Sequence, residues 1–360
     1  MREITIAGQT YGDSNSFVIA EAGHNHGGAV GNAKQIARAA SVAGASAVKF
    51  QTRTPKEVYQ ANDKRGAYFY ESDNPQWMDK QYGKHRVKLE FTEPEWRDLY
   101  GYCKHELKIP FISTPFDFKS ADLLEELGVP AYKIASGDAT NVPLLRHVAK
   151  FDKPMIVSTG GCSMEDVRRI ARELENRVPL AILQCSCVYP ARADTLNLRV
   201  IETYRREFPG IVIGLSSHYP DWNVNIAAWM LGARIFENHF TVSREWKGTD
   251  NPFSLTPPMM EDFIKAIRAC DLALGKSEKF CQDVEKAQTE ERRKSIVWRR
   301  DLKMGHVVTA DDITYKCPGD GIEPYKNDEI IGSKLARSVI TEDTVRWSDI
   351  RLRDGVGGWA

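Results

Sequence analysis

The sequence predicts an α/β fold class: a TIM (β/α)8 barrel followed by a small β-rich domain. Eight short apolar segments recur along the chain, each ending in polar residues, and helical patterns lie between them. Eight strands that alternate with helices over about 250 residues match the number of elements and the chain length of this barrel. A doubly wound open sheet is the alternative, but "EAGHNHGG" after the first strand lacks the G-x-G-x-x-G phosphate turn of that fold.

The eight predicted strands are nearly continuous in Ile, Val, Leu, Ala and Phe. Such composition is typical of parallel strands that are covered on both faces. The predicted strands are 17–23, 47–51, 110–117, 131–138, 154–161, 180–190, 212–220 and 234–240.

Helical patterns fill the intervals between the strands. The clearest are 32–44, 92–107 and 163–174. Thr92 with Glu95 forms a capping-box pattern, in which two side chains satisfy backbone donors at a helix start. Ser163 and Asp166 repeat the device. These signals place helix starts between predicted strands, as the barrel requires, although a long insertion, 52–91, precedes the helix at Thr92.

The chain divides into three parts by composition. Residues 1–275 hold the strand and helix alternation, and 276–293 form a highly charged linker. From 294 to 360 short β-like runs and turn residues predict a compact second domain.

Composition excludes several classes of function. Forty-nine basic and 49 acidic residues balance, so no overall field attracts nucleic acid or an anionic membrane. No window approaches the ~20 apolar residues of a membrane span. The seven cysteines are scattered and are interpreted as reduced thiols, although Cys185 and Cys187 also form a weak C-x-C metal signal. We therefore expect a cytoplasmic protein without a nucleic-acid or membrane partner.

Polar side chains close every predicted strand. Catalytic groups of such barrels lie at the carboxyl ends of the strands, so these residues are expected to meet at one mouth. They are Glu21, Lys49, Gln51, Ser113, Thr114, Lys133, Ser136, Asp138, Ser158, Thr159, Tyr189, Ser216, His218, Glu237 and His239. Two lysines with several hydroxyl groups predict a site for a phosphate or a carboxylate.

Two histidines end neighbouring strands. His218 and His239 close the seventh and eighth segments, and imidazole pairs suit Mn, Fe, Co or Zn. The carboxylates of Asp138 and Glu237 favour a metal, since acidic groups usually accompany metal-binding histidines. Two hydrogen-bonded core histidines are the alternative.

Eight ordered blocks carry a resemblance to a known family. "IAEAGHNHGG", "AVKFQT", "FISTPFD", "AYKIASGD", "LLRHVAKFDKPMIVSTGG", "GLSSH", "ENHFT" and "CPGDGI" resemble those of the N-acetylneuraminate (sialic acid) synthase family, over about residues 17–350. The resemblance implies a TIM barrel with an antifreeze-like (SAF) domain, and a homodimer whose small domain reaches over the partner's active site. It further implies condensation of phosphoenolpyruvate with an N-acylated hexosamine to give a 2-keto acid and phosphate, with Mn²⁺ or Mg²⁺.

The resemblance also assigns roles to residues. The expected phosphoenolpyruvate ligands are Lys49, Thr114, Lys133, Ser136, Ser158 and Ser216. The expected metal ligands are His218 and His239, with Glu237 beside them. Gln51, Tyr189 and Cys317 are assigned to the sugar, and Glu21, Asp138 and Asp250 to catalysis. Either Asp138 or Glu21 is placed to take the proton of the attacking water.

Five positions depart from the family pattern. Asp138 stands where Glu is usual, Ser217 where Asp is common, and Gln184 where His is usual. Cys187 replaces Asn or Ser, and Cys317 replaces an Arg that holds the substrate's acyl amide. We therefore predict an intact phosphoenolpyruvate and metal site but an altered sugar site, so the aldose is an N-acylhexosamine or an unacylated or differently substituted sugar.

Two alternatives to this synthase remain. One is a catalytically inactive homologue that binds carbohydrate, and the other is a related lyase or aldolase without phosphoenolpyruvate. The presence of Lys49, Lys133 and Ser136 argues against the lyase.

Overall fold

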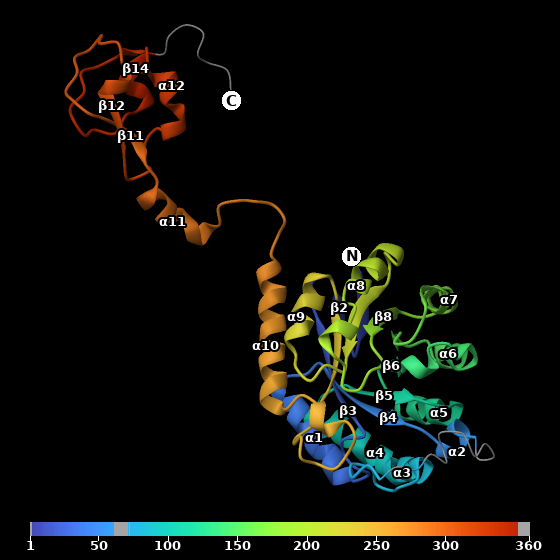
Figure 1. The fold of residues 1–360 in the computed structure, drawn as a ribbon. Coiled ribbons are helices and arrows are strands. Elements are labelled where there is room, and N and C mark those ends of the chain that lie inside the picture. Colours follow the sequence, from blue (N-terminus) through green and yellow to red (C-terminus); the bar gives the residue numbers. More distant parts are fainter. Residues whose placement is uncertain (1, 61–70, 72, 352–360) are drawn as a thin grey trace. The chain divides into compact units, whose positions relative to one another are not determined.

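The computed structural model describes residues 2–60, 71 and 73–351 of the chain. The chain folds into two compact units, Met1–Gly275 and Lys276–Ala360, which are described separately (Figure 1). Residues 352–360 of the predicted small domain, and residues 61–70 and 72 of the first domain, lie outside the described residues.

The first unit is a closed barrel of parallel strands, in the order β10-β3-β4-β5-β6-β7-β8-β9. Each of the eight predicted strands overlaps one of them, so the TIM-barrel prediction is confirmed. The strands are β3 Phe17–Gly23, β4 Ala47–Thr52, β5 Phe111–Pro115, β6 Tyr132–Ile134, β7 Met155–Ser158, β8 Leu180–Cys185, β9 Val212–Ser217 and β10 Ile235–His239.

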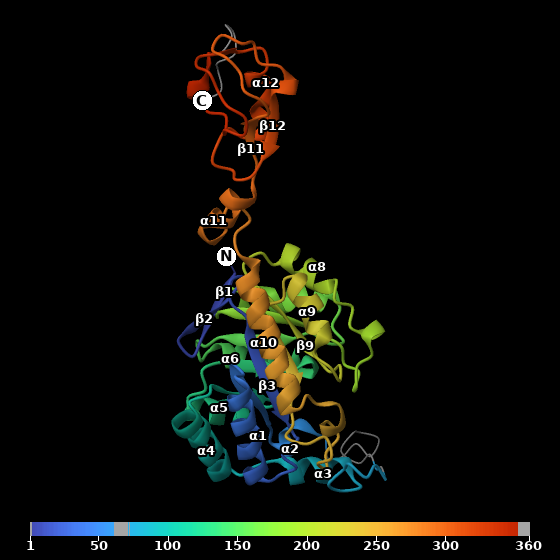
Figure 2. The same cartoon turned by 90° about the vertical axis from the view of Figure 1, so that its left-hand side faces the viewer.

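Helices surround the barrel in both views (Figures 1 and 2). They are α1 Val30–Ala43, α4 Glu93–Gly101, α5 Phe118–Leu127, α6 Val142–Ala149, α7 Met164–Leu174, α8 Val200–Glu207, α9 Asn223–Met230 and α10 Pro257–Leu274, with the short α2 Pro55–Val58 and α3 Tyr82–Leu89 after β4. Both predicted capping boxes form, at Thr92 and at Ser163. The predicted helix 92–107 differs in its second half, which continues α4 as a π-helical turn, Tyr102–Leu107.

A short hairpin that was not predicted closes the amino-terminal end of the barrel. It consists of β1 Glu3–Ile6 and β2 Gln9–Gly12. Ile4, Ile6 and Tyr11 are buried against the first inward-facing residues of the barrel strands, such as Phe17. The barrel interior is therefore sealed and apolar at this end.

The inward-facing side chains change character along the strands. Successive side chains of a strand point to opposite faces, so every second residue faces the interior. In β3, Ile19 lies in the apolar interior cluster, and Glu21, two residues on, lines a polar cavity. In β10, Ile235 gives way to Glu237 and His239 in the same manner. The same inward-facing positions thus supply an apolar core at one end and polar groups at the other.

The second unit has its own hydrophobic core around Trp298 and Ile296. Its elements are α11 Asp283–Arg292, β11 Ser295–Trp298, β12 Ile313–Lys316, α12 Asn327–Ile330, β13 Lys334–Leu335 and β14 Ile350–Arg351. The segment predicted as a charged linker contains α11, whose start carries a capping box of Gln282 and Glu285.

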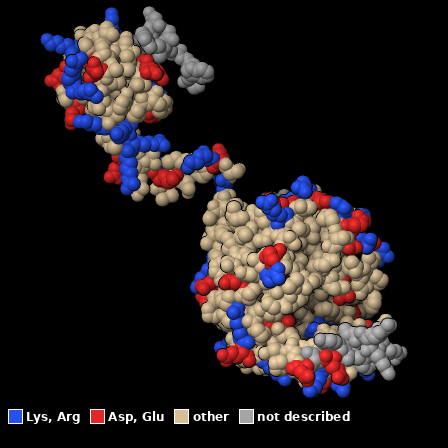
Figure 3. Space-filling view, in the orientation of Figure 1, with Lys and Arg blue, Asp and Glu red and all other residues tan. Residues whose placement is uncertain are grey.

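Basic and acidic side chains lie interspersed over the face drawn in Figure 3. This mixture accords with the zero formal net charge of the sequence. Among the helices of the described residues, none has the length and apolar character needed to cross a membrane.

Candidate active site

A small polar cavity of about 50 Å³ lies at the carboxyl ends of the barrel strands. Its lining is Glu21, Lys49, Gln51, Thr114, Phe116, Lys133, Ala135, Ser136, Ser158, Cys185, Tyr189, Ser216, His218, Glu237 and His239. A larger cleft of about 720 Å³ lies elsewhere on the barrel, and another of about 790 Å³ shares Cys185 with this cavity. The volume of a cleft does not identify the active site in this protein. The buried charged side chains converge on the small cavity and not on the larger clefts.

Lys49 projects into the cavity from β4 and is 3% exposed. The register pairs it with Glu21 on β3, and its Nζ lies 2.8 Å from the Oε2 of that carboxylate. Nζ also donates to Thr114 Oγ1 at 3.0 Å. These contacts fix the ammonium group on the inner wall.

Lys133 is the second buried ammonium, 2% exposed. Its Nζ donates to Ser158 Oγ at 2.6 Å and lies 3.8 Å from Glu237 Oε2. Burial lowers the pKa of Lys133, although Glu237 opposes that shift. The predicted pairing of two lysines with hydroxyl groups is therefore present in the structure.

Glu237 lies between the two lysines. Lys49 Nζ is 3.9 Å from its Oε1, and Ser216 Oγ donates to the same oxygen at 3.1 Å. Burial raises the pKa of Glu237, but the charges of Lys133 and Lys49 outweigh burial and leave this pKa below its ordinary value. Two ammonium groups and the two carboxylates of Glu21 and Glu237 thus balance in charge.

The two histidines lie side by side, with ring centroids 5.3 Å apart. His218 Nδ1 is 2.7 Å from the carbonyl oxygen of Ser186, which fixes that nitrogen as the donor and leaves the Nε2 lone pair available. Burial is the main cause that lowers the pKa of His218 to about 4. His239 Nδ1 is buried without a hydrogen-bond partner in the described part of the chain.

These features fit a divalent cation held by two imidazoles. Asp250 Oδ2, 3.6 Å from His239 Nδ1, adds a carboxylate nearby. No group of three or more His, Cys, Asp or Glu side chains within residues 2–60, 71 and 73–351 is arranged to hold a metal. The remaining ligands of such a cation would therefore come from substrate or water.

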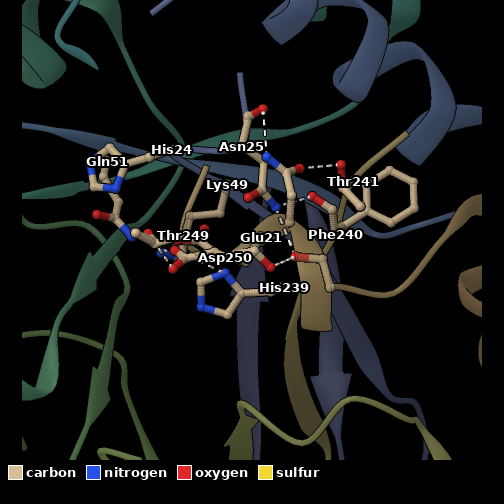
Figure 4. Close-up of polar contacts among 12 residues, drawn as sticks. Glu21, His24, Asn25, Lys49, Gln51, His239, Phe240, Thr241, Thr249 and Asp250 are labelled. Carbon is tan, nitrogen blue, oxygen red and sulfur yellow. Dashed lines mark hydrogen bonds and ion pairs between the residues drawn. The ribbon is translucent and has the colours of Figure 1, made fainter. Parts of the chain in front are cut away.

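Asn25 holds the Asp250 loop against the barrel, a role that the sequence did not reveal (Figure 4). Its Nδ2 donates to the Phe240 carbonyl at 2.9 Å and to Ser254 Oγ at 2.8 Å. Ser254 Oγ in turn donates to the Asp250 carbonyl at 2.7 Å. The only signal was an Asn between two histidines directly after a strand.

Two predicted site residues that follow β6, Ser136 and Asp138, lie in different surroundings. Ser136 lines the cavity and accepts a hydrogen bond from the Gly160 amide at 2.9 Å. Asp138 lies two residues on in a 3₁₀ turn, where it accepts from Asn141 Nδ2 at 3.1 Å, and does not line the cavity. Burial raises its pKa. Of the two candidate bases, Glu21 is the one that lines the cavity.

A buried ion pair extends the site beyond the predicted residues. Gln51 Nε2 donates to Glu21 Oε1 at 2.8 Å and its Oε1 accepts from Arg53 Nη2 at 2.5 Å. Arg53 Nε lies 3.3 Å from Glu90, whose pKa is raised to about 7, chiefly by burial. Arg53 directly follows the end of β4, two residues after Gln51, and this spacing could have identified it. Glu90 is distant in sequence and gave no signal.

The two remaining sugar-site predictions lie in different units. The ring of Tyr189 stacks on His218 with centroids 3.9 Å apart, at the mouth of the cavity. Cys317 is an exposed residue of the second unit, and its Sγ donates to the Arg292 carbonyl at 3.2 Å.

Comparisons with known proteins agree with the sequence resemblance. The NeuB family profile matches residues 36–279, and the SAF domain profile matches 293–351. The chain is 34% identical to N-acetylneuraminate-9-phosphate synthase of Homo sapiens, over 93% of this chain and 92% of the relative. It is 35% identical to N,N'-diacetyllegionaminic acid synthase of Legionella pneumophila, over 93% and 94%.

A solved structure shares the fold. The crystal structure of N-acetylneuraminic acid (sialic acid) synthetase from Leptospira borgpetersenii, in complex with citrate, superposes with a TM-score of 0.70 at 28% identity. The match covers 80% of this chain and 95% of that one.

Proposed function

We propose, from the premise that this chain belongs to the NeuB family, that it is a synthase which condenses phosphoenolpyruvate with an aldose. The products are a 2-keto-3-deoxy sugar acid and phosphate. The observation that carries the proposal is the pair of buried ammonium groups, Lys49 and Lys133, at the catalytic mouth of the barrel.

The lysines are suited to the phosphate and carboxylate of phosphoenolpyruvate. Charge-assisted hydrogen bonds to such anions are roughly twice as strong as neutral ones. The hydroxyl groups that complete this set are those of Thr114, Ser136, Ser158 and Ser216. The presence of Lys49, Lys133 and Ser136 argues against an aldolase that acts without phosphoenolpyruvate.

Charge balance supports a divalent cation at His218 and His239. The lysines are already paired with Glu21 and Glu237, so a substrate carrying several negative charges needs further positive charge. We assign Mn²⁺ or Mg²⁺ to the two imidazoles. When bound, such an ion polarises a carbonyl oxygen and stabilises the negative charge that develops on it.

The residues of the chain then act in sequence. Ser136 and the two lysines orient phosphoenolpyruvate while its enol carbon attacks the aldehyde carbon, which forms the new C–C bond and leaves C2 electron-deficient. Water adds to C2, and Glu21 takes its proton. The aldehyde oxygen, left as an alkoxide by the C–C bond formation, takes up a proton and becomes a hydroxyl group. The C2 hydroxyl group loses its proton as the C2–O bond to the phosphate breaks, which gives the keto group, and Lys49 and Lys133 stabilise the departing phosphate.

The sugar site is proposed not to depend on an N-acyl group. Cys317 offers one weak thiol donor where relatives are expected to use an Arg fork. Lys316, a neighbouring cation that could replace it, is ion-paired with Glu342. Losing one contact to the acyl group costs about 1–3 kcal/mol, or ~10- to 100-fold in selectivity.

We further propose a homodimer in which the second unit covers the active site of the partner. The charged linker 276–293 is long enough to cross a subunit boundary, and the resemblance to the family implies the exchange. Sedimentation should show a dimer at micromolar concentration, and a fully active monomer would contradict it. A cytoplasmic location and the lack of a nucleic-acid partner remain predictions.

The test is phosphate release from phosphoenolpyruvate across a panel of aldoses with Mn²⁺. Release that requires an aldose supports the synthase. If the folded chain binds sugars but releases no phosphate with any of them, the inactive carbohydrate-binding homologue replaces it.

A further inference from the structure

Three cysteines line a cleft of about 790 Å³ that adjoins the active-site cavity. They are Cys162, Cys185 and Cys187, all free thiols. Cys185 is buried and also lines the active-site cavity, whereas Cys187 is exposed. One residue of the pair therefore lines the catalytic cavity, and the other, two residues away, is exposed to solvent.

The sulfur atoms of Cys185 and Cys187 point to the same place. A Cβ atom added to Gly160 would lie 2.6 Å from Cys187 Sγ and 3.3 Å from Cys185 Sγ. The hydroxyl group of Ser136 lies 2.9 Å from that same position. Because residue 160 is glycine, both thiols can lie close to its backbone. A three-cysteine metal site is excluded, since the described part of the chain holds no metal-competent group of three such side chains.

Ser186, the residue between the two cysteines, connects them to the histidine pair. Its carbonyl oxygen accepts the hydrogen bond from His218 Nδ1 at 2.7 Å. A disulfide across one intervening residue cannot reach relaxed geometry without backbone movement. Because Ser186 lies between the two cysteines, we expect that movement to displace its carbonyl group from His218. Losing the outer partner of a metal-binding histidine typically costs about 10- to 100-fold in metal affinity or activity.

We propose that Cys185 and Cys187 form a peroxide-sensitive dithiol whose oxidation to a disulfide switches the enzyme off through Ser186 and His218. The thiolate of Cys187 attacks a peroxide oxygen, which gives a sulfenic acid and releases hydroxide. The Cys185 sulfur then attacks the sulfenic sulfur, the S–S bond forms and water leaves. The two electrons lost by the thiols reduce the peroxide, and a small dithiol reverses the reaction.

The two thiols differ in reactivity in the way that this sequence of steps requires, with Cys187 the more reactive. A hydrogen bond from Cys185 is the main cause that lowers the pKa of Cys187 to about 6, while the pKa of Cys185 is raised well above its ordinary value. Thiolates are the nucleophilic form, so the exposed Cys187 reacts first and the buried Cys185 resolves it. A strained or exposed disulfide is the labile and regulatory kind.

Trypsin places both cysteines in one peptide, 178–192, separate from Cys162 in 151–168. After brief treatment of the full-length protein with hydrogen peroxide, peptide 178–192 should weigh less by two hydrogen atoms and resist alkylation. Dithiothreitol should restore both free thiols. Measuring the mass and alkylation of this peptide needs no substrate. Its result is therefore independent of the proposed function on which the switch rests.

Activity completes the test. Peroxide should lower wild-type turnover by about tenfold or more, reversibly, as expected for a lost partner of a metal-binding histidine. Cys187→Ser should keep its activity under the same dose, while the matched control Cys162→Ser should behave as wild type. The proposal is overturned if peptide 178–192 keeps two alkylated cysteines while activity falls, if its disulfide forms without loss of activity, or if Cys187→Ser is equally sensitive.

Discussion

Replacing Lys133 by Met tests the anion site most sharply, because the change removes the ammonium group and keeps much of the side-chain volume. Lys133 donates to Ser158 Oγ at 2.6 Å and lies 3.8 Å from Glu237. A hydrogen bond to a charged group contributes about 1.5–3 kcal/mol. At 1.4 kcal/mol for each factor of ten, phosphoenolpyruvate should bind about 10- to 100-fold more weakly.

The same change should lower stability. Glu237 would keep a single ammonium neighbour, Lys49 at 3.9 Å. Breaking a buried ion pair by removing one partner costs about 3–5 kcal/mol, and Lys49 offsets part of this. The free energy of unfolding of Lys133→Met should therefore be lower than that of the wild type.

Calorimetry with phosphoenolpyruvate and urea denaturation measure the two effects. Lys153→Met is the matched control, because Lys153 pairs with Glu125 at 2.6 Å and its side chain is 25% exposed. Such a pair is worth about 0–1 kcal/mol and lies outside the cavity. Equal phosphoenolpyruvate affinity in Lys133→Met and wild type, or an equal loss in Lys153→Met, would refute the reasoning.

Three further predictions test the metal, the sugar and the buried imidazoles. His239→Ala should abolish turnover that depends on a divalent cation while circular dichroism stays unchanged; full activity in chelator-treated buffer would remove the metal from the mechanism. Cys317→Arg should raise kcat/KM for N-acetylmannosamine relative to mannose by ~10-fold or more, and a wild-type preference for N-acetylmannosamine as strong as that of the variant would show that position 317 does not set selectivity. Burial lowers the pKa of His26 to about 3 and of His85 to about 4, so the unfolded chain binds more protons below about pH 6.5. The free energy of unfolding should therefore fall from pH 6.5 to 4, and urea midpoints that do not change over this range would contradict it.

Much of the site could be predicted from sequence because strands alternate. Lys49, Lys133 and Glu237 each sit an even number of residues after an apolar inward position, so period two and the barrel rule place them in one mouth. The positions of the strand ends were sufficient to predict these three residues as part of the site.

Residues after the strand ends were less predictable. Asp138 follows Ser136 by two residues, but a 3₁₀ turn replaces the strand there and the alternation no longer applies. The amino-terminal hairpin was missed because its strands have four residues each, too short for a periodic signal. Glu90 reaches the site through a contact with Arg53 far away in sequence, which no local pattern encodes.

The central claim is that this chain joins phosphoenolpyruvate to an aldose and releases phosphate by C–O cleavage. Phosphoenolpyruvate carrying a heavy-oxygen label at its bridging atom tests it most directly, with Mn²⁺ and either N-acetylmannosamine or mannose as the aldose. We predict one 2-keto acid formed for each phosphate released, with the label in the phosphate and with both products absent when the aldose is omitted. Phosphate release without an aldose, a label that stays in the keto acid, or no phosphate from the folded chain with either sugar would contradict the account.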